Sequence, residues 1–451
     1  MRFQLLWLGA DSCYAIMVDQ LKSRLQQSDV LMILWTVLSS FGVYFCMYAF
    51  RKPFSAGLYE GLMLWGVGYK AILIIAQVVG YTLSKFVGIK VISELKPQQR
   101  VYLIVGLILI AEVALLLFGL MPHPYGFLLL FLNGLPLGMV YGVVFSFVEG
   151  RHLTEMLAMG LSISVVIASG ILKTIYLDLA VLFPQISEFW MPAFMGGIFL
   201  LPFLLFVWML TIIPDPTDFD IKQRTKRLPM THFDKVQVLR RYGLSIFCLV
   251  LFYAGLVVVR DFRDNFTIEI WNEIDAGWEN GVLAQTETIS GFVVFVVIGL
   301  LVYVKSNLLA FRLTNLIMLA GMLLCGGATY LFQTGVIQGF SWMLSLGIGT
   351  FLTYTALQTV IFERFIALFR VKANAGFFVY ICESIGYLGS VGLLLFKEFF
   401  MKDISWSSVL MNFTYGQVVI GLGLLLVANF LLEWQRVRSH PEREAVVFET
   451  A

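Results

Sequence analysis

The chain has 451 residues, of which 59% are hydrophobic and only 13% are charged, and its mean hydropathy is +0.86. Soluble globular domains carry about 25% charged residues, so this composition excludes an ordinary soluble protein and is typical of a membrane protein with many spans. The formal net charge of +2 does not indicate a nucleic-acid partner, because in a membrane protein the placement of charge matters more than its sum.

The five cysteines and four histidines predict neither a metal site nor a disulfide framework. No two cysteines form a CxxC pair, and all but Cys13 lie inside long apolar runs, where they are expected to be small buried hydrophobic residues. The GxSxG, HExxH and P-loop motifs of soluble enzymes are missing as well. We therefore expect a protein that is not an enzyme and that uses no cofactor and no metal.

Residues 1–30 are moderately apolar, but Asp11, Asp19 and Lys22 interrupt them. They lack the clean apolar core and the small-residue cleavage site of a secretory signal. We expect a cytoplasmic lead-in that lies at the membrane interface as an amphipathic helix, or one that is poorly ordered.

Twelve long apolar segments follow, and each is long enough to cross a bilayer as one helix. Their approximate spans are 31–50, 68–89, 101–121, 124–148, 157–180, 189–213, 243–261, 281–304, 308–333, 337–362, 373–397 and 408–432. One long polar interval separates the first six segments from the last six. The predicted domains are a six-helix bundle over 31–213, a cytoplasmic linker over 214–242, a second six-helix bundle over 243–434 and a cytoplasmic tail over 435–451.

The placement of lysine and arginine indicates which helix ends face the cytoplasm. Most of the 31 basic residues fall in the lead-in, in the loops after even-numbered helices, in the linker and in the tail. Because cytoplasmic loops of membrane proteins are enriched in these residues, we expect both termini on the cytoplasmic side.

The two halves of the chain weakly repeat one another. Tyr44 and Arg51 in the first helix of the first half have the same spacing as Tyr253 and Arg260 in the first helix of the second half. The glycine-rich fourth segment, NGLPLGMVYG, has a counterpart in LGIGTFLTYT of the tenth. The predicted fold class is an all-α membrane protein with twelve transmembrane helices in two six-helix half-bundles of the major facilitator type, with a site near mid-membrane at the repeat interface.

The stretches MYAFRKPF (47–54) and YTLSKFVG (81–88) resemble motifs of the organophosphate:phosphate antiporters of the major facilitator superfamily, which include glycerol-3-phosphate and hexose-6-phosphate transporters. The stretch MYAFRKPF (47–54) is similar to the family's tyrosine-rich end of the first helix, followed by Arg-Lys and an aromatic residue. The stretch YTLSKFVG (81–88) is similar to its Tyr-x-x-Ser-Lys-Phe element, and Arg260 matches its seventh-helix arginine in spacing. The family's histidine in the fifth helix has no counterpart in 157–180, and some uncharacterised bacterial membrane proteins have a similar pairing of the two motifs.

The resemblance implies that Arg51, Lys85 and Arg260 bind the substrate. Arginine suits a phosphoryl group because its planar fork donates two parallel hydrogen bonds and stays charged. The tyrosines expected to assist are Tyr44, Tyr48, Tyr81 and Tyr253. A structural alternative is that the basic side chains extend to the membrane surface and that the tyrosines only pack or lie at the interface. Lys52 points about 100° away from its neighbour around the helix, so we expect a structural or interfacial role for it.

Further charged residues inside the predicted helices are candidates for gating and coupling. The resemblance implies that helices two and eleven face each other across the cavity, as do helices five and eight. This suggests the cross-half ion pairs Lys85–Glu383 and Lys173–Glu287, which would gate alternating access because unpaired charge inside a membrane is costly. The structural alternative for Glu383 is a protonated, hydrogen-bonded packing residue. Glu112 in the third helix has no predicted partner.

The predicted function is secondary active transport of a small organic anion, phosphorylated and exchanged for phosphate. We expect the protein to act as a monomer in the inner membrane of a bacterium. One alternative is a proton-coupled symporter of a carboxylate or a sugar, with Glu383 as the proton site. The other is a membrane sensor on a transporter scaffold, which would bind a sugar phosphate without moving it.

Single cysteines placed between residues 222 and 235 of a cysteine-free variant test the predicted orientation. An impermeant thiol reagent should leave them unlabelled in intact cells and should label them in inverted vesicles, because this basic segment is expected inside. Labelling from outside in intact cells would contradict the orientation.

Overall fold

A computed structural model describes residues 16–121, 123–148, 154–214, 232–371, 373, 375–401 and 404–439. Nearly all of these residues are helical, and among them twelve helices are long and apolar enough to cross a membrane. The predicted twelve membrane helices are therefore confirmed, and the protein is a multi-pass membrane protein. Most of the predicted linker, the start of the lead-in and the end of the tail lie outside the described residues.

The chain forms two compact units. Unit 1 comprises Met1–Tyr59 and Ile72–Thr225, and unit 2 comprises Glu60–Ala71 and Lys226–Ala451. The segment 60–71, which joins the first two membrane helices and includes the first three residues of the second, therefore belongs to unit 2.

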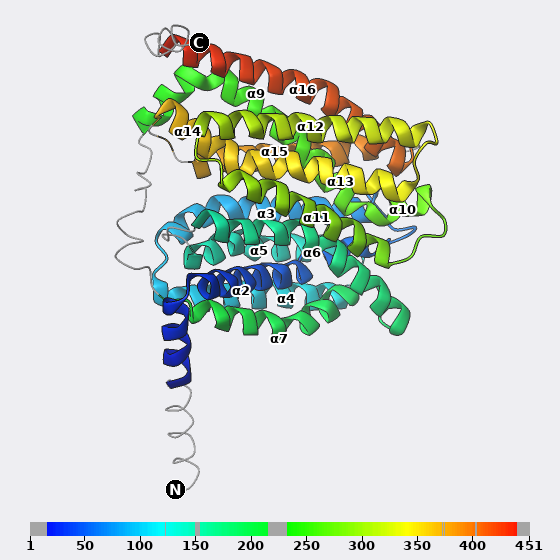
Figure 1. The fold of residues 1–451 in the computed structure, drawn as a ribbon. Coiled ribbons are helices and arrows are strands. Elements are labelled where there is room, and N and C mark those ends of the chain that lie inside the picture. Colours follow the sequence, from blue (N-terminus) through cyan, green and yellow to red (C-terminus); the bar gives the residue numbers. More distant parts are fainter. Residues whose placement is uncertain are drawn as a thin grey trace. The chain divides into compact units, whose positions relative to one another are not determined.

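Unit 1 is built on the first six membrane helices (Figure 1). Its elements are α2 (Asp29–Ala49), η1 (Pro53–Ala56), α3 (Tyr69–Ser93, from Ile72 onward), η2 (Pro97–Gln99), α4 (Arg100–Leu120), α5 (Gly126–Val148), α6 (Thr154–Leu182) and α7 (Met191–Thr211). Residues 16–27 form a further helix that turns away from α2 (Figure 1). The turn is at Ser28, whose Oγ accepts a hydrogen bond from the Leu31 amide at 3.3 Å and so caps the start of α2.

Unit 2 is built on the last six membrane helices. Its elements are the hairpin β1 (Met63–Leu64) and β2 (Val67–Gly68), α9 (His232–Asn265), α10 (Thr267–Ile274), α11 (Gly281–Val302), α12 (Asn307–Gln333), α13 (Gly339–Ala356), the π-helical turn η3 (Leu357–Ile361), α14 (Phe362–Phe369), α15 (Ala375–Phe400) and α16 (Trp406–Ser439). In the hairpin, Trp65 and Gly66 both have positive φ, at 55° and 75°, as a two-residue type I′ turn requires.

The helices pair in the same way in both units. In unit 1 the first helix, α2, packs against α6 and α7, and the third, α4, packs against α5. In unit 2 the first helix, α9, packs against α15 and α16, and the third, α12, packs against α13. The weak sequence repeat thus corresponds to a repeat of packing.

Several helices extend beyond the apolar spans. The helix α9 begins at His232 rather than near residue 243, and α13, η3 and α14 continue without a break to Phe369. An α-helix satisfies its own backbone hydrogen bonds, so it can continue into the aqueous layer with a polar sequence. The charged stretch after α9 forms a short separate helix, α10, which was not predicted.

Glycine lets helices approach closely in each unit. A Cβ atom built on Gly134 of α5 would lie 2.3 Å from the carbonyl oxygen of Gln77 in α3, a distance that real side chains do not reach. In unit 2 a Cβ atom on Gly349 of α13 would lie 2.4 Å from the carbonyl oxygen of Gly321 in α12. Close backbone contact through small residues is a common way for helices to associate in membranes. The glycine-rich segments are therefore explained by packing.

The Gly134→Ala variant should be destabilised, because its new methyl group meets backbone that cannot rotate away. Overpacking of this kind typically costs about 1–3 kcal/mol. Gly197→Ala in α7 is the matched control, since a Cβ atom there meets nothing within 4 Å and alanine favours a helix over glycine. Thermal unfolding in detergent should give a lower Tm for the first variant only. Equal Tm values would show that the α3–α5 crossing tolerates a side chain.

Candidate functional site

The matched arginines both lie close to the end of the first membrane helix of their unit. Arg51 directly follows Phe50, the C-cap of α2, and Arg260 lies near the end of α9. Their exposed fractions are only 7% and 8%. Side chains that extend to the membrane surface would be far more exposed, so this burial favours an internal role.

In unit 1 two cations gather at one tyrosine ring. The Cζ atom of Arg51 is 3.8 Å from the ring centroid of Tyr81 in α3 and 5.6 Å from that of Tyr48 in α2. The Nζ atom of Lys85, one turn after Tyr81, is 5.1 Å from the same ring. The structure thus brings four predicted site residues together, and their role in binding stays a prediction. Each such cation–π contact contributes about 0.5–2 kcal/mol.

Two buried amides fix the backbone beside Arg51. The Nε2 atom of Gln77 in α3 donates to the carbonyl oxygen of Arg51 at 2.9 Å and to Oδ1 of Asn133 in α5 at 2.8 Å. The Nδ2 atom of Asn133 donates to the carbonyl oxygens of Phe50 at 3.1 Å and Ala111 at 3.0 Å. The last carbonyls of a helix lack partners within it, so these amides satisfy groups that would otherwise be buried unpaired. Sequence reasoning missed both amides, although polar residues inside apolar spans were the available signal.

A contact between tyrosines recurs in both units about two turns before the arginine. In unit 1 Tyr44 of α2 meets Tyr141 of α5 with 5.5 Å between ring centroids. In unit 2 Tyr253 of α9 meets Tyr354 of α13 at 5.1 Å. Tyr141 and Tyr354 are the ninth residues of the two similar glycine-rich segments, so the contacts are equivalent in the repeat. Neither was predicted as a site residue, although aligning the two segments would have found them.

Unit 2 adds a buried carboxylate to this tyrosine pair. Glu383 of α15 is 5% exposed, and its Oε1 atom accepts hydrogen bonds from the hydroxyl groups of Tyr253 and Tyr354, the second at 2.7 Å. Hydroxyl donors of this kind stabilise a carboxyl group that is removed from water. The network lies wholly in unit 2, so the pairing of Glu383 with Lys85 stays a prediction.

Arg260 is held by its neighbour in the chain. Its Nε and Nη2 atoms both donate to Oδ1 of Asp261, at 3.0 Å and 2.8 Å. Its Cζ atom also lies 4.4 Å from the ring centroid of Tyr354. Asp261 was not predicted as a site residue, because residues next to each other on a helix usually point apart.

A second buried ion pair lies one turn further along α9. Arg263 Nη1 is 2.7 Å from Glu287 Oε1 of α11, and Arg263 Nη2 donates to the carbonyl oxygen of Met343 in α13 at 3.1 Å. The observed partner of Glu287 is therefore Arg263 of the same unit, and an ion pair with Lys173 stays a prediction. Lys173 is 1% exposed in α6 of unit 1.

Lys70 of segment 60–71 forms an ion pair with Glu269 of α10. The Nζ atom of Lys70 lies 2.5 Å from Oε1 of Glu269, and both side chains are largely buried. The amide of Gly68 also donates to Oε2 of Glu398 in α15 at 2.9 Å. These contacts hold the segment to unit 2.

Lys52 and Glu112 are both buried within unit 1. Lys52 is 7% exposed, and its carbonyl oxygen accepts a hydrogen bond from Ser55 Oγ at 2.8 Å in the turn after α2. Glu112 of α4 is 8% exposed and packs directly against Gly196 of α7, where an added Cβ would lie 2.0 Å from its Oε2.

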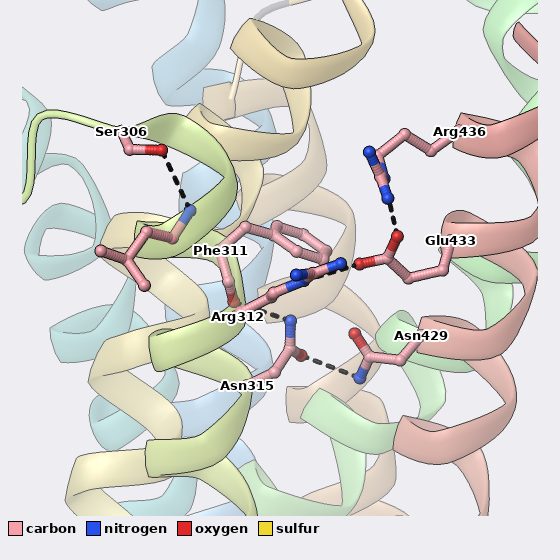
Figure 2. A network of polar contacts seen from close by, with 8 residues as sticks. Ser306, Phe311, Arg312, Asn315, Asn429, Glu433 and Arg436 are labelled. Carbon is pink, nitrogen blue, oxygen red and sulfur yellow. Dashed lines mark hydrogen bonds and ion pairs between the residues drawn. The ribbon is translucent and has the colours of Figure 1, made fainter. Parts of the chain in front are cut away.

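Removing one partner of the buried Arg263–Glu287 pair should be costly. Glu287→Gln leaves the guanidinium buried without its charge partner, a change that typically costs about 3–5 kcal/mol. The matched control is Glu433→Gln, which breaks the pairs with Arg312 and Arg436 shown in Figure 2. The Arg312 side chain is 57% exposed, and exposed pairs contribute only about 0–1 kcal/mol. The Tm should fall sharply only for the Glu287 variant, and a similar fall in both would contradict this account.

Residues 53–435 match a family model described as a family of unknown function, DUF5690. Among curated proteins, none matches this sequence.

Solved transporter structures share the fold. A bacterial homologue of the human lysosomal transporter Spinster, in an inward-facing and unoccupied conformation, is 13% identical with a TM-score of 0.59, over 90% of this chain and 97% of that one. The nucleoside transporter NupG is 13% identical with a TM-score of 0.59, over 88% and 98%. The POT family transporter PepTSo is 12% identical with a TM-score of 0.56, over 91% and 98%. This likeness confirms the predicted major facilitator fold.

Proposed function

The chain belongs to the DUF5690 family, and from its fold and its two buried arginine clusters we propose that it is a secondary active transporter of a small organic anion. The substrate carries a phosphoryl group and is exchanged for phosphate by alternating access. The protein works as a monomer in the inner membrane of a bacterium, with both termini in the cytoplasm. Support for transport comes from the fold that it shares with transporters of several substrates.

The observation that carries this proposal is the burial of an arginine against a tyrosine ring at the matched position of both repeats. Arg51 lies on Tyr81 in unit 1, and Arg260 lies on Tyr354 in unit 2. A basic residue inside a membrane helix costs about 2.5–3.5 kcal/mol on insertion scales, so a buried ionisable residue in a membrane bundle is a functional-site candidate. A ring that stacks on the face of a guanidinium does not cover its N–H edges, and the two N–H groups of one edge fit two phosphoryl oxygens.

Other residues of the unit 1 cluster add a second charge and hydroxyl groups beside Arg51. Lys85 adds a second positive charge beside Tyr81, as a point charge without the geometry of the arginine fork. Tyr44 and Tyr48 are within ring contact of each other, with 5.6 Å between centroids, and supply hydroxyl groups for the polar part of the substrate.

A proton-coupled symporter is the second candidate, and Glu383 favours it. This carboxyl group is buried, and it receives hydrogen bonds from the hydroxyls of Tyr253 and Tyr354. A buried acid that is hydrogen-bonded to two tyrosines is a suitable proton site in a membrane transporter. Uptake of a carboxylate or a sugar that depends on a proton gradient, and that Glu383→Gln abolishes, would favour this function over phosphate exchange.

The test of anion exchange is a binding screen followed by a flux measurement. Purified protein is titrated with inorganic phosphate, with sugar phosphates and with their non-phosphorylated analogues while thermal unfolding is followed. We expect inorganic phosphate and sugar phosphates to raise the Tm, and their non-phosphorylated analogues to leave it unchanged. The compounds that raise the Tm should also drive counterflow in liposomes. Binding without flux would instead indicate the sensor.

Lysine at either arginine position should weaken phosphate binding by at least about tenfold, because lysine keeps the charge but loses the planar fork. The variants are Arg51→Lys and Arg260→Lys, singly and together. Arg312→Lys is the control, since that arginine is exposed and pairs with Glu433. Binding at wild-type strength by the double variant would refute the anion site.

A further inference from the structure

One N–H edge of Arg260 is already occupied by a carboxylate of the same chain. Both Nε and Nη2 donate to the single Oδ1 atom of Asp261, at 3.0 Å and 2.8 Å. The two side chains are only 9% and 10% exposed, so the pair is shielded from bulk water. Nε and Nη2 form one of the two-donor edges with which arginine holds carboxylate or phosphate.

The geometry of this contact suits exchange. Side chains of adjacent residues diverge by about 100° around a helix, so this contact joins two side chains that leave α9 in different directions. The flat face of the guanidinium meanwhile stays on the Tyr354 ring, 4.4 Å from its centroid. The ring therefore keeps the guanidinium in position whichever oxygen occupies its N–H edge.

The other buried acids around this part of unit 2 have partners of their own. Glu287 is paired with Arg263, and Glu383 accepts hydrogen bonds from Tyr253 and Tyr354. Asp261 is the acid whose contact with Arg260 must break when another anion takes the same edge.

We propose that Asp261 is a specificity-determining residue, an internal counter-anion that a ligand must displace from Arg260. This inference rests on the proposed function of Arg260 as an anion-binding residue. A ligand with one negative charge has the same charge as the carboxylate that it displaces. Its attraction to the guanidinium is therefore about as strong as the attraction that is lost. A ligand with two negative charges gains about twice the Coulombic attraction at the same distance. The site therefore selects doubly charged phosphoryl groups over carboxylates and other single anions.

A pair of probes of one shape and different charge tests this selection. Sulfate and methanesulfonate are both tetrahedral and both ionised at neutral pH, with two and one negative charges. Binding of each to the purified full-length protein is measured by calorimetry, together with inorganic phosphate. Wild-type protein should bind sulfate and phosphate and should bind methanesulfonate far more weakly.

The Asp261→Asn variant should bind methanesulfonate about tenfold tighter or more, because close buried charge pairs couple by about 1.5 kcal/mol or more and 1.4 kcal/mol is tenfold. The ratio of sulfate to methanesulfonate affinity should fall accordingly. Glu433→Gln removes one acid of unit 2 whose side chain is 34% exposed, and it should leave both affinities unchanged.

The remaining outcomes separate this inference from the proposed function. If Arg260→Lys abolishes sulfate binding while Asp261→Asn leaves the affinity ratio unchanged, the anion site stands and the role of Asp261 is refuted. If neither wild type nor Asp261→Asn binds any of the three anions, both proposals fail.

The Asp261→Asn protein is also purified with sulfate throughout, since a displacing anion should replace the missing carboxylate. A variant that stays unfolded with sulfate present would overturn the inference.

Discussion

Both units keep positive charge inside helical bundles that are mostly apolar. An isolated charge buried in a low-dielectric interior costs several kcal/mol, so each cation needs aromatic faces, amide dipoles or a carboxylate around it. Arg51 rests on Tyr81, and the backbone beside it is fixed by Gln77 and Asn133. The same requirement explains why Gln77 and Asn133 hydrogen-bond to each other and to the backbone beside Arg51.

The two repeats meet this requirement differently. They share a frame, in which the first helix contacts the fifth and sixth, and a tyrosine of the first helix contacts a tyrosine of the fourth. In unit 2, acids contact the basic and hydroxyl groups. Asp261 pairs with Arg260, and Glu383 accepts hydrogen bonds from Tyr253 and Tyr354. Unit 1 places aromatic rings and amides around Arg51. The two units therefore differ more in the charged and polar groups that they bury than in how their helices pair.

The close glycine crossings and the polar clusters support each other within a unit. In unit 1 Gly134 brings α5 against α3, and the adjacent Asn133 reaches the end of α2 from that position. In unit 2 an added Cβ on Gly347 of α13 would lie 2.9 Å from Nη2 of Arg263, so glycine also makes room for a buried guanidinium. Small residues thus decide where a charged side chain can be enclosed.

The sequence alone determined the number of membrane helices, the two-half organisation and the positions of the matched arginines. These are local properties, because the length of an apolar run and the spacing of Tyr44 and Arg51 do not depend on the rest of the chain. Only the tertiary structure showed that Asp261 faces Arg260, that Tyr141 and Tyr354 complete the tyrosine pairs, and that residues 60–71 belong to unit 2. The physical reason is that the partner of a buried polar group is set by side-chain direction and by helices distant in the chain, which hydropathy and spacing do not encode.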